Sequence, residues 1–138
     1  MIPTDARILV IAPHADDETI SLGASLSLWS GRARVALVSG GPYTSPVTGE
    51  VDERQKNAEF QAAMHALGIV NWSVLGYPES RLDTVPMVDL VTTLDDEISA
   101  HDPGVILSPL PSHHQDHRTV SLAVRASLRR AERGDVMM

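Results

Sequence analysis

Two short segments of the chain concentrate residues that bind metals and move protons. They are PHADDE at residues 13–18 and PLPSHHQDH at residues 109–117. Two imidazoles and a carboxylate bind zinc well and leave a fourth position for a water molecule, which the metal acidifies for attack on a carbonyl. A second carboxylate can take the water proton, and a further imidazole can stabilise the oxyanion or protonate the leaving amine. Together the segments contain every group that metal-assisted hydrolysis of an amide requires.

Each segment alone also has an ordinary structural explanation. Asp16, Asp17 and Glu18 precede a predicted helix, where acidic residues cap free N–H groups and complement the helix dipole. The histidines of residues 113–117 could form the solvated start of another helix. A shared function is favoured only if the fold brings the two segments together.

The elements that position these segments alternate between strand and helix. Short apolar runs predict buried strands at residues 8–12, 34–39, 73–77 and 104–108. Helical spacing of apolar residues predicts helices at residues 19–30, 52–67, 88–100 and 119–133. Residues 40–49 and 78–84 are rich in turn-forming or polar residues and are expected to be loops.

This alternation indicates an α/β fold, a Rossmann-like three-layer sandwich with a mostly parallel sheet and the strand order 3-2-1-4. Ligands of such sheets bind at the carboxyl ends of the strands, where the strand order reverses. Here that point lies between the first and the fourth strand. Residues 13–18 follow the first strand and residues 109–117 follow the fourth, so the two segments are expected to face each other.

The same segments resemble the motifs of the LmbE-like, or PIG-L, family of zinc-dependent N-acetylglucosamine deacetylases. APHADDET at residues 12–19 is similar to the family form A-P-H-P-D-D-E-T, with Ala15 where Pro is usual, and HQDH at residues 114–117 matches H-x-D-H. Weaker similarities are the Arg-led helix from Arg54 to Gly68 and LGYPESRL at residues 75–82. The latter resembles L-G-x-P-D-G-x-L with Glu for Asp and Ser for Gly. The resemblance covers nearly the whole chain.

The resemblance implies a role for each matching residue. The zinc ligands would be His14, Asp17 and His117, the catalytic residues Asp16, His114 and Asp116, and the substrate contacts Arg54 and Glu79. Asp16 would be the general base, His114 would face the oxyanion, and Asp116 would orient a nearby imidazole. The donor set also suits Fe(II). The expected substrate is a small molecule that contains N-acetylglucosamine.

Composition restricts the partners and the compartment. The 138 residues fit a single domain, residues 1–138, and the formal net charge of −7 argues against nucleic acid as a partner. There are no cysteines, and neither a signal peptide nor an apolar run long enough to span a bilayer is recognisable. We therefore expect a cytoplasmic protein. His101 follows a helix end, where a protonated imidazole would interact favourably with the dipole.

The sequence also allows two other functions, and the family resemblance bears on the end of the chain. A catalytically silent sugar-binding or assembly subunit of the same fold is the main alternative. A nucleotide-binding protein is disfavoured, because the first segment has no glycine and its three acids would repel phosphate. Members of the family usually continue well beyond the helix that follows H-x-D-H, so a missing C-terminal part is expected here. The apolar fourth strand would then be an unprotected edge that favours self-association or a further strand.

Overall fold

The computed structural model describes residues 2–45, 47 and 49–129. The main sheet is formed by β1 (Ile8–Ala12), β2 (Ala33–Leu37), β5 (Trp72–Val74) and β6 (Val105–Leu107). The helices are α1 (Asp17–Trp29), α2 (Glu53–Ala66), α3 (Met87–His101) and α4 (Gln115–Leu128), and η1 (Leu82–Thr84) is a short 3-10 turn. A separate hairpin is formed by β3 (Tyr43–Ser45) and β4 (Gly49–Val51).

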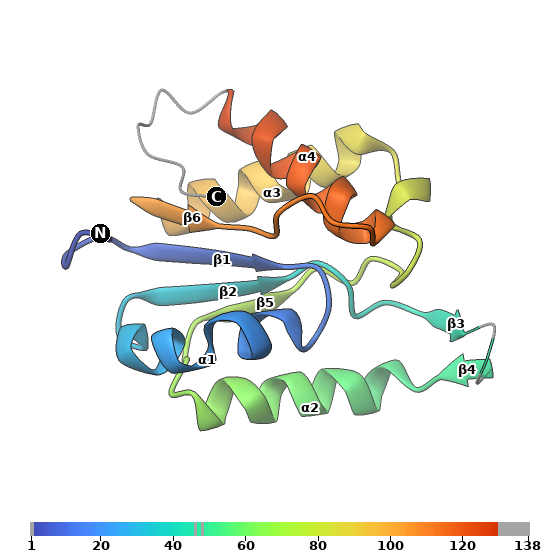
Figure 1. The fold of residues 1–138 in the computed structure, drawn as a ribbon, viewed down its shortest axis with the longest axis horizontal. Coiled ribbons are helices and arrows are strands. Elements are labelled where there is room, and N and C mark those ends of the chain that lie inside the picture. The colour runs from blue at the N-terminus through green and yellow to red at the C-terminus, as the bar shows by residue number, and fades with distance from the viewer. Residues whose placement is uncertain (1, 46, 48, 130–138) are drawn as a thin grey trace.

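The sheet is parallel and has the order β5-β2-β1-β6. Helices α1 and α2 cover one face and α3 and α4 cover the other, which gives three layers (Figure 1). The predicted α/β class and three-layer architecture are confirmed. The four predicted strands, at residues 8–12, 34–39, 73–77 and 104–108, correspond to β1, β2, β5 and β6 in that order. The labels β5 and β6 replace three and four because the β3–β4 hairpin adds two strands to the numbering.

Strand β1 is buried on both faces and joins two apolar clusters. Leu9 and Ile11 pack in the cluster beneath α3 and α4, whereas Ile8 and Val10 pack against Phe60 and other residues of the α1–α2 layer. The alternation follows from the two-residue period of a strand, which sends neighbouring side chains to opposite faces. This central position holds the end of β1, and the loop that follows it, on a rigid base.

Helix boundaries differ from the predicted ones at both chemical segments. Helix α1 begins at Asp17 instead of residue 19, and α4 begins at Gln115 instead of residue 119. Both motifs therefore enter the first turn of a helix, where side chains have fixed directions. The β3–β4 hairpin replaces part of the predicted loop at residues 40–49. Residues 130–133 of the last predicted helix lie outside the described residues.

Two further features of the described residues bear on the predictions. Strand β6 has β1 as its only neighbour within these residues, so it is an edge of the described sheet. None of the helices described here has the length and apolarity needed to cross a bilayer.

Candidate metal centre

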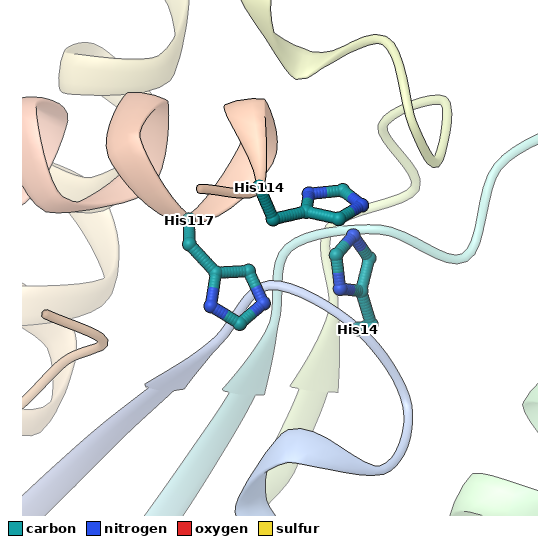
Figure 2. A group of neighbouring side chains, drawn as sticks. All are labelled: His14, His114 and His117. Carbon is teal, nitrogen blue, oxygen red and sulfur yellow. The ribbon is translucent and has the colours of Figure 1, made fainter. Parts of the chain in front are cut away.

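The two chemical segments meet at the carboxyl end of the sheet. His14 lies in the loop after β1, and Asp17 is the first residue of α1. His114 is the N-cap of α4, and His117 lies in its first turn. The rings of His14, His114 and His117 point toward one another (Figure 2), although they come from distant parts of the sequence.

Asp17 joins two of the imidazoles. Its Oδ2 atom lies 3.2 Å from His117 Nε2 and 3.4 Å from His14 Nδ1. Ligand atoms of a tetrahedral zinc ion with bonds of 2.0–2.1 Å are about 3.3–3.4 Å apart. The two distances from Asp17 therefore match the spacing of ligand atoms on one zinc ion, and two imidazoles with one carboxylate are a donor set that zinc accepts.

His114 is close enough to form a second possible ligand set. Ligand atoms of His14, His114 and His117 all lie within 4.8 Å of one another. However, His114 Nδ1 already accepts a hydrogen bond from the Asp116 backbone N–H, at 3.2 Å, and so caps α4. The nitrogen that remains is Nε2, which in the neutral ring then carries the proton. His114 Nε2 is thus a donor beside the other two rings.

Asp116 is a fully buried carboxylate that fixes His14. Its Oδ2 atom lies 2.9 Å from His14 Nε2, while the other ring nitrogen of His14 faces Asp17. The backbone N–H groups of Ser80 and Leu82 donate to the same carboxylate, at 2.7 Å and 3.0 Å. A carboxylate behind a ligand imidazole sets its tautomer and its orientation. The predicted orienting role of Asp116 therefore has a specific geometric basis.

The protonation of the cluster reflects these contacts. Burial alone would lower the pKa of His14, but the hydrogen bonds and charges of Asp116 and Asp17 outweigh it and raise the pKa to about 9. Burial raises the pKa of both carboxyl groups, but the contacts with His14 more than reverse this, so both pKa values are lowered. The charge of His117 adds to the effect at Asp17, and the Leu82 and Ser80 N–H groups add to it at Asp116. In the metal-free protein the cluster thus holds a proton at neutral pH, which a metal ion would have to displace.

Asp16 occupies the N-cap position of α1, but its side chain makes no capping hydrogen bond. The helix-cap explanation for this residue therefore gains no support. Its exposed side chain instead borders a polar hollow of about 380 Å³. The lining residues are His14, Ala15, Asp16, Lys56, Glu59, Glu79 and His114. Four of the predicted site residues, His14, Asp16, Glu79 and His114, thus line this polar hollow.

The two predicted substrate contacts have different positions. Glu79 lines the polar hollow and accepts two hydrogen bonds from Lys56 Nζ, at 2.7 Å and 2.8 Å. Arg54 is exposed at the start of α2 and is not among the residues that line the hollow. Lys56, which sequence reasoning missed, supplies the cation there. Lys56, Phe60 and Met64 are spaced four residues apart and therefore lie along one side of α2, where Phe60 and Met64 are buried. This spacing in the sequence is the signal that could have identified Lys56.

A second hollow also borders the cluster. Asp17 and His117 border this space of about 410 Å³, whose other walls are mostly apolar parts of β1, α1 and the β6 end. Glu18 is buried in the same wall. Burial raises the pKa of its carboxyl group, although the Thr19 hydroxyl donates to Oε1 at 2.8 Å and opposes the shift. The sequence did not predict that this acid would be buried.

Solved structures share this fold. N,N'-diacetylchitobiose deacetylase from Pyrococcus horikoshii has a TM-score of 0.74 and 21% identity, over 91% of this chain and 50% of its own. The A40926 pseudoaglycone deacetylase has a TM-score of 0.71 and 25% identity, over 89% of this chain and 59% of its own. The chain thus spans about half to three fifths of the length of these two proteins.

The fold by itself does not determine the reaction. The 4-carboxy-2-hydroxymuconate hydratase from Pseudomonas putida KT2440 also matches, with a TM-score of 0.62 and 21% identity, over 87% of this chain and 54% of its own. A comparison with curated protein sequences gives no match. The sequence profile described as PIG-L, GlcNAc-PI de-N-acetylase, matches residues 9–128. This match includes both motifs and all the elements from β1 to α4, and the chain therefore belongs to the PIG-L family.

Proposed function

We propose that the protein is a zinc-dependent hydrolase that removes the acetyl group from a small molecule containing N-acetylglucosamine. The observation that carries the proposal is the position of Asp17 Oδ2, 3.2 Å from His117 and 3.4 Å from His14, next to a polar hollow that contains Asp16. Membership of a de-N-acetylase family supports the same reaction.

His14, Asp17 and His117 would hold the metal. A zinc ion there would supply a Lewis acid for the amide carbonyl and lower the pKa of a water molecule. Asp16 would be the base that takes a proton from the attacking water and the acid that returns it to the leaving amine. His114 donates from Nε2 to the oxygen that becomes negatively charged. Asp116 keeps His14 in the required tautomer through the 2.9 Å contact.

The polar hollow is suited to the sugar part of the substrate. Lys56, Glu59 and Glu79 offer donors and acceptors for hydroxyl groups on the side of the cluster where Asp16 lies. Because Asp16 returns its proton to the amine, the amino sugar belongs on this side. Lys56 with Glu79, in place of Arg54, form the substrate contact that we propose.

Release of acetate from N-acetylated glucosamine and chito-oligosaccharides tests the proposal. Asp16→Asn keeps the size and polarity of the side chain but removes the base, so we expect full zinc content and a rate lowered by roughly 100-fold or more. The matched control is Asp5→Asn, at an exposed acid near the start of the chain. We expect the control to retain the activity of the unmodified protein.

The outcomes separate this function from the alternatives. A zinc-containing protein that binds the sugars without releasing acetate would be the silent binding subunit. An Asp16→Asn protein as fast as the unmodified one would show that Asp16 is not the base. Loss of zinc from this variant would contradict the assignment of Asp16 as a residue that does not bind the metal.

A further inference from the structure

The loop that carries Glu79 bends through an unfavourable backbone conformation. Ser80 has a φ angle of 61°, in the left-handed region. A residue with a Cβ atom is disfavoured there because this atom crowds the neighbouring carbonyl group, whereas glycine has no such penalty. Ser80 therefore needs contacts from its surroundings to remain in this conformation, and the position of Glu79 depends on them.

The first turn of α4 supplies these contacts. The N–H of Ser80 donates to Asp116 Oδ2 at 2.7 Å, and the carbonyl of Ser80 accepts a hydrogen bond from the Gln115 side-chain amide at 3.0 Å. The N–H of Leu82 donates to the other oxygen of Asp116, at 3.0 Å. Both backbone polar groups of Ser80 are thus bound by consecutive residues of α4.

The two residues of α4 act on different sides of the centre. Asp116 also contacts His14, so its removal would disturb the metal site together with the loop. The hydrogen bond from Gln115 is made to the loop, immediately after Glu79, whose carboxylate reaches Lys56 in the polar hollow. Gln115 therefore offers a way to change the loop without changing a contact of the metal cluster.

We propose that Gln115 is a positioning residue for substrate binding: its amide holds the backbone of Ser80 in the left-handed conformation and thereby keeps Glu79 beside Lys56 in the polar hollow. The inference rests on the proposed function, because the hollow is taken to bind the sugar. Gln115 is the variable position of the H-x-D-H motif, and in this chain it would stabilise the Ser80 backbone. The stabilisation is needed because Ser80 stands where the family motif has Gly.

Gln115→Ala, Ser80→Gly and the double variant test the proposal on the full chain with zinc bound. We expect Gln115→Ala to raise KM for N-acetylglucosamine roughly three- to tenfold, the size of one hydrogen bond, with kcat and zinc content unchanged. Glycine adopts the left-handed conformation freely, so the double variant should return KM to near the value of the unmodified protein. Gln61→Ala, at an exposed Gln on α2, is the matched control and should change nothing.

Hydrogen exchange of the Ser80 and Leu82 amides gives a measurement that needs no turnover. We expect faster exchange in Gln115→Ala and protection restored in the double variant. If no sugar is turned over, the proposed function fails while the exchange result still decides the role of Gln115. Unchanged exchange, an unchanged KM in an active enzyme, a loss of zinc, or a KM that Ser80→Gly does not restore would each overturn the proposal.

Discussion

His14 has a different carboxylate at each ring nitrogen. Nδ1 lies 3.4 Å from Asp17 and Nε2 lies 2.9 Å from the buried Asp116. With a metal ion bound as we propose, one nitrogen would bind the ion and the other would donate its proton to Asp116. The proposal therefore predicts separable effects of single residues on metal binding and on the rate.

Asp116→Asn separates these effects at the residue scale. The asparagine oxygen can accept from Leu82, but its NH₂ group would then face the N–H of Ser80 and the ring of His14. We expect the affinity for zinc to fall roughly 10- to 100-fold and the free energy of unfolding to fall by about 1–3 kcal/mol. Zinc titration and denaturant unfolding of the same sample measure both. An unchanged zinc affinity would show that Asp116 does not orient His14.

Sequence reasoning at this scale is most specific where a motif fixes the position of each residue. His14, Asp17 and His117 stand in short motifs that the fold brings together, whereas Arg54 came from a weaker similarity to an Arg-led helix. Arg54 and Lys56 are two residues apart, which is about 200° around a helix, so only one of them can face the hollow. The buried stripe of α2 selects Lys56.

At the scale of the elements, the loops after β2 and β5 lie in close contact. The N–H of Gly41 donates to the Tyr77 carbonyl at 3.0 Å, and a Cβ atom at position 41 would overlap the carbonyl of Gly76. Only glycine at position 41 leaves room for the backbone of residues 76–77, which precede Glu79. This constraint links the loop after β2 to the polar hollow.

Gly41→Ala should therefore destabilise the protein by roughly 1–3 kcal/mol, since backbone atoms must move to make room. Gly31→Ala is the matched control, because a Cβ atom there meets nothing within 4 Å. We expect the control to be neutral or more stable by up to about 1 kcal/mol. Chemical denaturation compares the two variants, and equal stabilities would contradict the close approach of these loops.

The end of α3 differs from the sequence-based expectation for His101. A protonated imidazole was expected at the helix end, but the ring lies 3.1 Å from the Ile8 carbonyl. Burial lowers the pKa of His101 from its ordinary 6.5, and the charges of Arg34 and Arg7 act in the same direction, against the contact with the Ile8 carbonyl. The neutral ring, which donates one hydrogen bond, is therefore the form that the fold favours.

This lowered pKa gives stability a defined dependence on pH. The unfolded chain takes up the proton at a higher pH than the folded protein does. The contribution of His101 is therefore fully present above about pH 6.5 and is lost as the pH falls toward the lower folded pKa. His101→Gln keeps an uncharged donor, so its unfolding free energy should rise relative to that of the unmodified protein as the pH falls from 7.5 to 5.5. A constant or falling difference between the two proteins would contradict the assignment.

The elements were predictable where they are long or strongly apolar. Strand β1 and the middle of each helix follow from apolar spacing, but the β3–β4 hairpin consists of two three-residue strands with no apolar alternation. The starts of α1 and α4 were placed too late. Their first turns contain acidic residues and histidines, whose composition resembles that of a loop.

At the scale of the whole molecule, the strand order could be predicted because right-handed strand–helix–strand connections leave few alternatives. That order brings the segments after β1 and β6 together, and with them the candidate site. The length of each strand, the two hollows and the Lys56–Glu79 ion pair depend on side-chain packing that one sequence does not reveal. Self-association through the β6 edge remains a prediction.

The central claim is that His14, Asp17 and His117 hold the metal while His114 stays free to act on the substrate. Equilibrium dialysis against zinc, with metal analysis of the protein, tests it most directly on four alanine variants. The expected result is one tightly bound zinc per chain for the unmodified protein and for His114→Ala, and none for His14→Ala, Asp17→Ala or His117→Ala. Retention of zinc by Asp17→Ala together with its loss from His114→Ala would contradict the account and identify the three histidines as the ligands.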